Sequence, residues 1–112
     1  MAAIGVLVVV SLASTPHVPA LACSKWDIGW CRSVTGRVVS AQRMDGDGDG
    51  DLHLVLMSHD SVSAPGVSIV KVRAENRPSR MPRFGQWVSA IGFPQYGASG
   101  LAEVDARRMR VK

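Results

Sequence analysis

The chain has 112 residues, of which 46% are hydrophobic and 20% are charged, and its formal net charge is +4 at pH 7. This length accommodates one domain and excludes a large multi-layer enzyme. With 11 glycines and 2 cysteines, the composition also excludes collagen, a coiled coil, a disordered polar tail and a disulfide-dense toxin. The sequence therefore indicates a fold, a compartment and a broad class of function, without naming a specific activity.

Residues 1–22 are predicted to be a cleavable signal peptide. The apolar run Ala2–Val10 is shorter than the roughly 20 residues that a membrane span needs. Small residues and prolines follow, and then Ala20-Leu21-Ala22, which is an A-x-A cleavage motif. No Lys or Arg precedes the apolar run. A buried first strand and an uncleaved anchor are the alternatives to a secreted or periplasmic protein.

Two cysteines, Cys23 and Cys31, would begin the mature chain, in an N-terminal segment of residues 23–32. In an oxidising compartment we expect them to pair, and closing so short a loop would contribute about 2–3 kcal/mol. Acylation of Cys23 in a lipoprotein is the alternative, although a lipobox prefers Leu, Val or Ile where this chain has Ala20. The aromatic residues of this segment that we expect to plug one end of the domain are Trp26 and Trp30.

Residues 33–112 are predicted to form a small all-β domain. Short β-rich runs alternate with connectors rich in Gly, Pro, Ser or Asp, and no run has a helical period beyond two turns. The runs are Ser33–Arg43, Asp51–Ser58, Gly66–Ala74, Gln86–Phe93 and Gly100–Val111. Five strands in about 80 residues, without a βαβ rhythm, favour a five-stranded antiparallel barrel.

Alternation within these runs predicts the core and the bends of the barrel. The apolar residues expected to face inward are Leu52, Leu54, Leu56, Val70, Val72, Val88 and Ala90. A glycine inside a strand marks a bulge or sharp bend, which we expect at Gly36 and Gly92. In the last run, Met109 and Val111 do not continue the alternation that Val104 begins, so a bulge is predicted near Ala106–Arg108.

The order of short motifs in this domain resembles that of an OB-fold. The motifs are Gly36-x-Val38, Asp49-Gly50-Asp51-Leu52-His53-Leu54, Ile69-Val70-Lys71-Val72, Gly85-x-x-Val88-x-x-x-Gly92 and Glu103-Val104. More narrowly, the chain is similar to small secreted bacterial OB-like domains over roughly Thr35 to Val111. Many OB-folds carry a helix between strands three and four, but here Pro78 and Pro82 predict a basic loop. The resemblance implies a fold and no particular function, because OB-folds host unrelated activities.

An Asp-Gly repeat lies between the first two runs and is the main candidate metal site. A metal bound across strands by His53, Asp51 and Glu103 is a second candidate, although a surface histidine is the favoured interpretation of His53. The candidate ligands for a weak calcium site are Asp45, Asp47, Asp49 and Asp51. Counted from Asp45, position twelve is Leu56, where an EF-hand needs a bidentate Glu, so an EF-hand is excluded. A solvated hairpin turn, in which Asp-Gly supplies positive φ angles, is the favoured interpretation.

Positive charge on the third run and the following loop predicts a binding face. The candidate ligand-binding residues are Lys71, Arg73, Arg80, Arg83, Trp87 and Tyr96. A basic face that is merely solvated is the favoured interpretation of this charge, and the partner is unknown. A polyanion, such as an anionic envelope polymer or lipid headgroups, or an envelope protein is the alternative. Single-stranded nucleic acid is a further candidate, but stacking needs aromatic residues on the second and third strands, which have none.

Catalysis has little support in the sequence. His53 and His59 are the histidines that follow the leader, and neither belongs to a recognisable catalytic motif. No Gly-rich phosphate loop precedes a helix. The sequence therefore predicts an exported, non-enzymatic OB-fold binding module of unknown ligand. A structural or protein-interaction module of the cell envelope, with a weakly calcium-stabilised loop, is the alternative.

Overall fold

The computed structural model describes residues 18–24, 29–44 and 50–112. Predictions that fall on residues 1–17, 25–28 or 45–49 lie outside the described residues, and these include most of the leader and Trp26. The described elements are β1 (Arg32–Met44), β2 (Asp51–Ser58), β3 (Val67–Val72), the short 3-10 turn η2 (Ala74–Asn76), β4 (Trp87–Tyr96) and β5 (Ala102–Val111). Within these ranges, no helix has the length and apolar character that crossing a membrane requires.

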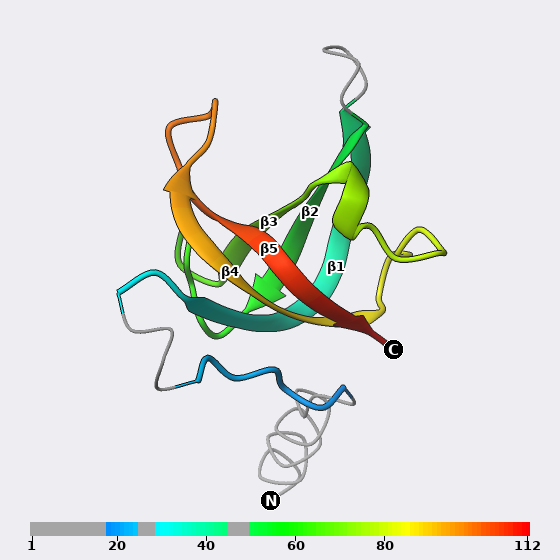
Figure 1. Ribbon diagram of the computed structural model, residues 1–112, viewed down its shortest axis with the longest axis horizontal. Coiled ribbons are helices and arrows are strands. Elements are labelled where there is room, and N and C mark those ends of the chain that lie inside the picture. The colour runs from blue at the N-terminus through cyan, green and yellow to red at the C-terminus, as the bar shows by residue number, and fades with distance from the viewer. Residues whose placement is uncertain (1–17, 25–28, 45–49) are drawn as a thin grey trace, which may run out of the picture.

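The five strands close into a barrel in the order β1-β2-β3-β5-β4 (Figure 1). β1 is shared by both sides of the barrel, since residues 32–37 pair with β4 and residues 36–44 pair with β2. The predicted all-β barrel is confirmed, and its strand order is compatible with an OB-like fold.

The prediction that all strands are antiparallel is wrong for one pair. β3 and β5 run parallel, with Ile69 opposite Glu103 and Val72 opposite Ala106. The other four pairs are antiparallel. Strand directions cannot alternate all the way around a ring with an odd number of strands, so a closed five-stranded barrel contains at least one parallel pair.

Side chains at every second strand position fill the barrel, as the alternation predicted. The predicted inward-facing residues of β2, β3 and β4 are all buried, with exposures of 0–1%. The core cluster consists of Val34, Val38, Leu52, Leu54, Leu56, Val70, Val72, Val88, Ala90, Val104 and Ala106. Burying this contiguous set of aliphatic side chains is the main source of stability in so small a domain.

Two of the three predicted irregularities are confirmed. Between β4 and β5 the register passes from Ile91 opposite Arg108 to Gly92 opposite Ala106, which leaves Arg107 as the extra residue of a bulge. The bulge in β1 lies instead between Val38 and Ser40, so a bulge at Gly36 is not found, and a bend there stays a prediction. Gly36 is needed for a close approach, because a Cβ there would lie 2.3 Å from the carbonyl oxygen of Met57.

The two cysteines form the predicted disulfide. The Cα atoms of Cys23 and Cys31 are 5.9 Å apart, and the bond joins the N-terminal segment to the residue that precedes β1. A thiol in a disulfide cannot carry an acyl chain, so this pairing disfavours the lipoprotein alternative. A disulfide is consistent with an oxidising, extracellular compartment.

Candidate functional site

The barrel presents Lys71 and Arg73 on its outside, but a carboxylate of a neighbouring strand engages each of them. Lys71 Nζ lies 3.3 Å from Asp51 Oδ2 of β2. Arg73 contacts Oδ2 of Asp105 in β5 through Nη2 at 2.9 Å and through Nε at 3.1 Å. The hydrogen bond and the negative charge of Asp105 raise the pKa of Arg73 above its usual value. Both cations are therefore largely neutralised within the barrel wall.

Asp105 explains why Arg73 has a structural role. The carboxylate side chain of Asp105 is only 2% exposed, although it lies on the outer side of β5. Its other oxygen, Oδ1, is buried and has no hydrogen-bond partner among the described residues. A buried carboxylate is tolerated when a cation compensates it, and Arg73 supplies that cation.

The loop of residues 77–86 carries the other two predicted cations, Arg80 and Arg83, and both are exposed. Its returning end is attached to β1, because the Val38 N–H donates to the carbonyl of Gln86 at 2.9 Å. The side chain of Gln86 then accepts a hydrogen bond from the backbone N–H of Arg83 at 2.7 Å. The loop is thus fixed at its base, while the side chains of its two arginines are exposed.

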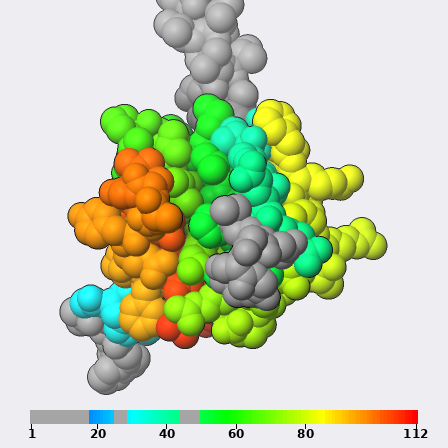
Figure 2. Space-filling view, turned by 90° about the horizontal axis from the view of Figure 1, so that it is seen from above, coloured from blue at the N-terminus to red at the C-terminus, as the bar shows by residue number. Residues whose placement is uncertain are grey.

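A hollow of about 490 Å³ lies between this loop and the end of β5. Arg80 and Arg83 lie on its loop side with Met81, and Met109 and Val111 of β5 form its apolar floor. These two β5 side chains are partly buried and pack against the core cluster. The loop stands out from the rest of the surface, in yellow, in Figure 2. We call this site the arginine hollow.

Among the residues that the structure describes, no carboxylate forms an ion pair with the arginines of the arginine hollow. The segment from Arg77 to Gln86 contains no Asp or Glu. Neither Arg80 nor Arg83 forms an ion pair with any residue in the described ranges. A second hollow of about 340 Å³ borders the same loop at Arg77, Pro78 and Ser79. An exposed guanidinium without a carboxylate partner can bind an anion through up to two parallel hydrogen bonds.

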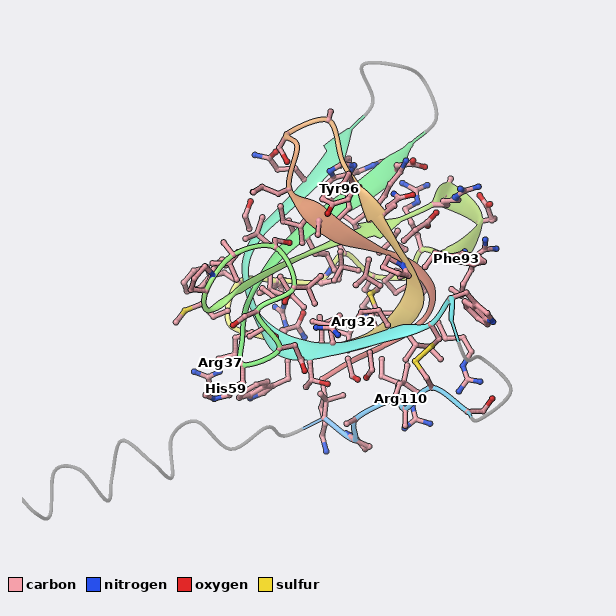
Figure 3. All side chains as sticks on the ribbon, turned by 90° about the vertical axis from the view of Figure 1, so that its left-hand side faces the viewer. Arg32, Arg37, His59, Phe93, Tyr96 and Arg110 are labelled. Atoms are coloured by element: carbon pink, nitrogen blue, oxygen red, sulfur yellow. A yellow bond between two sulfur atoms is a disulfide. The ribbon has the colours of Figure 1, made fainter. Side chains whose placement is uncertain are left out.

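The two predicted aromatic residues do not join the arginine hollow. Trp87 is only 8% exposed, and the guanidinium carbon of Arg37 lies 5.1 Å from its ring centroid, so its ring is not open to a ligand. Tyr96 is 82% exposed, but it lies on the β4–β5 hairpin, on the far side of the barrel from the loop (Figures 1 and 3). The aromatic residue next to the loop arginines is Phe84, which directly follows Arg83 in the sequence and is 80% exposed.

A separate aromatic cluster covers part of the outer surface of β4. The ring centroids of Trp30 and Phe93 are 4.7 Å apart, and the guanidinium carbon of Arg107 lies 4.5 Å from the centroid of Phe93. The expectation that Trp30 plugs the barrel was therefore wrong, because Trp30 packs against a side chain on the outside. In the sequence, Phe93 alternates with inward-facing residues of its strand and is therefore expected on the outside, which was the one sequence indication of this cluster.

The candidate calcium ligands Asp45, Asp47 and Asp49 lie outside the described residues. The fourth candidate, Asp51, is described, and its carboxylate contacts Lys71. Among the described residues, no group of three or more His, Cys, Asp or Glu side chains is placed to hold a metal ion. The calcium site and the absence of catalysis both stay predictions.

No protein-family model and no curated protein matches this chain. The function is accordingly inferred from the chemistry of the arginine hollow and its surroundings.

Proposed function

We propose that the chain is an exported, non-enzymatic binding module that captures an anionic ligand at the arginine hollow. The observation that carries this proposal is that Arg80 and Arg83 are exposed and have no ion pair within the described ranges. They stand beside an apolar floor formed by Met109 and Val111. Guanidinium groups bind phosphate, sulfate or carboxylate, and an apolar floor accepts the uncharged part of the same ligand.

A polyanion of the cell envelope is the ligand class that fits this chemistry best. The net charge of +4 attracts a negatively charged polymer at long range, and the hollow then supplies short-range contacts. The resemblance to small secreted bacterial OB-like domains supports export, and the disulfide favours an oxidising compartment.

Single-stranded nucleic acid is less well supported as the ligand. The outer surface of β2 and β3 carries His53, Val55 and Ile69, whereas base stacking needs aromatic rings. Among the described residues, Phe84 is the exposed ring that directly follows the loop arginines, so it offers a single position on which a base could stack. A structural or protein-interaction module of the envelope is the alternative, and it requires no anion at all.

Binding of fluorescein-labelled polyphosphate, followed by anisotropy across a salt series, tests the proposal. The double variant R80A/R83A should bind at least about tenfold more weakly, and its slope of log Kd against log salt should fall by about 1.5–2. The control R108A/R110A removes the same charge from exposed positions on the opposite face of β5 from Met109 and Val111. We expect it to change Kd by less than about threefold.

Three results would contradict the proposal. They are an absence of polyphosphate binding at low salt, an equal loss of affinity in both double variants, and unchanged binding by R80A/R83A. A labelled oligothymidylate of equal charge serves as the second probe. Tighter binding of this probe than of polyphosphate would assign the hollow to single-stranded nucleic acid.

A further inference from the structure

Two large apolar side chains are exposed on the loop of residues 77–86, which we call the arginine loop and which projects from the barrel in Figure 1. Phe84 is 80% exposed and Met81 is 41% exposed. Each of them directly follows an exposed arginine, Met81 after Arg80 and Phe84 after Arg83. A single exposed apolar residue is ordinary on a protein surface. The grouping of two such residues with two arginines is the feature that requires an explanation.

Backbone contacts hold the arginine loop in a fixed shape. Pro82, which lies between the two arginine-apolar pairs, is buried. Gly85 follows Phe84 with φ of +85°, and its N–H donates to the carbonyl of Val38 at 2.8 Å. A residue that precedes proline is confined to extended backbone, which also restricts Met81. A loop that is already ordered loses little conformational entropy when it docks on a partner.

The β4–β5 hairpin provides a contrast to the arginine loop. Tyr96 is 82% exposed and Leu101 is 42% exposed, so the apolar exposure of the two segments is similar. The hairpin segment from Pro94 to Glu103, however, contains no Lys or Arg. Apolar exposure therefore coincides with positive charge on the arginine loop and not on the hairpin.

Exposed apolar side chains among arginines suit the surface of an anionic lipid bilayer. The negative surface potential of such a bilayer attracts guanidinium groups. The boundary between headgroups and acyl chains accepts aromatic and aliphatic side chains. A soluble polyanion could bind the two arginines, but it would leave the ring of Phe84 in water. A bilayer accounts for both kinds of side chain at once.

We propose that the arginine loop docks on an anionic phospholipid bilayer. Arg80 and Arg83 contact the lipid phosphates, while Met81 and Phe84 enter the boundary between headgroups and acyl chains. The proposal rests on the anion binding proposed for the arginine hollow, and it identifies the anion as the phosphate of a lipid surface. In this orientation the β4–β5 hairpin, with Tyr96, faces away from the bilayer.

Cosedimentation of the exported full chain with vesicles tests the docking. The vesicles contain phosphatidylglycerol and phosphatidylcholine, and vesicles of phosphatidylcholine alone are the neutral reference. Phe84→Ala should weaken binding to the anionic vesicles about tenfold, because the ring is no longer buried in lipid. R80A/R83A should weaken it by about thirtyfold. Tyr96→Ala removes an equally exposed ring and should change it by less than about twofold. Any binding through the apolar run Ala2–Val10 is common to all variants and is measured with the neutral vesicles.

Polyphosphate binding separates this proposal from the function on which it rests. Phe84→Ala should keep its Kd for polyphosphate within about twofold of the parent, because the arginines are intact. If R80A/R83A binds both probes like the parent, both proposals fail. If the parent binds polyphosphate but does not prefer anionic to neutral vesicles, only the bilayer proposal fails, and the ligand is a soluble polyanion. Equal vesicle binding by Phe84→Ala and Tyr96→Ala would lead to the same conclusion.

The depth of the arginine loop in the bilayer has a separate readout. Brominated acyl chains in the anionic vesicles quench a tryptophan that reaches them. Phe84→Trp should add a quenched component to the fluorescence of the native tryptophans, whereas the component added by Tyr96→Trp should stay unquenched. The same quenching in both variants would show that the loop does not enter the bilayer.

Discussion

Gly92 offers the sharpest test of how the barrel closes. It is in β4, where that strand is paired with β1 on one side and with β5 on the other. A Cβ added to Gly92 would lie 1.9 Å from the carbonyl oxygen of Asp105, 2.6 Å from its carbonyl carbon and 2.8 Å from Cα of Ala106. All three atoms are backbone, so no side chain can rotate to make room for the methyl group in Gly92→Ala.

The expected loss of stability follows from the movement that this contact demands. β5 must shift by about 1 Å to restore the 3.0 Å below which Cβ contacts are essentially not found. Overpacking that side chains can absorb costs about 1–3 kcal/mol. A backbone shift at this corner also weakens about two ladder hydrogen bonds, each contributing about 1 kcal/mol. We therefore expect Gly92→Ala to lose about 4 kcal/mol, a large part of the 5–15 kcal/mol typical of a folded domain.

Urea unfolding, followed by tryptophan fluorescence and circular dichroism, measures this loss. Gly100→Ala is the matched control, because Gly100 has φ of +83° but no atom within 4 Å of an added Cβ. That variant should lose only about 1 kcal/mol, the usual cost of placing an L-residue in the left-handed region. If Gly92→Ala is no less stable than Gly100→Ala, steric closure at this corner is refuted.

Three further changes have expected outcomes. Reducing the disulfide should lower the free energy of unfolding by about 2–3 kcal/mol, and identical melting curves with and without dithiothreitol would contradict this. Arg73→Met should lower the melting temperature by more than Lys71→Met does, because the carboxylate of Asp105 is 2% exposed and that of Asp51 is 10% exposed. Urea unfolding of both variants ranks them, and the reverse order would argue against a structural role for the first pair. If the aspartate loop binds calcium, millimolar calcium should raise the melting temperature of the parent but not of the loop variant D47N/D49N, and an equal rise in both would rule out this site.

Local patterns predicted the interior of the barrel well. The extent of β2 was predicted without error, because its alternating leucines report directly which side of the strand is buried. The bulge at Arg107 was also predictable, since an extra residue shifts the alternation of all that follow it. β4 was predicted too short, because Pro94 resembles a strand end. Beyond Gly92, however, β4 is no longer paired with β1, and an edge strand tolerates proline.

Side-chain contacts between residues that are far apart in the sequence could not be predicted from local patterns. Arg73 and Arg83 are both basic positions in the sequence, yet only Arg73 meets a carboxylate, and that carboxylate is 32 residues away. Trp87 was a candidate ligand-binding residue, but Arg37 of a neighbouring strand covers its ring. In both cases the residue that makes the contact, Asp105 or Arg37, lies on another strand. These contacts therefore form only when the strands have come together in the barrel.

The position of β5 has a consequence for the order in which this protein can fold. β5 is the last strand of the chain, and it lies between β3 and β4, with which it forms the parallel pair and the longest antiparallel pair. Until it is synthesised, β3 and β4 both keep an unpaired edge, and the interior lacks Val104 and Ala106. A growing chain therefore cannot close the barrel before β5 emerges.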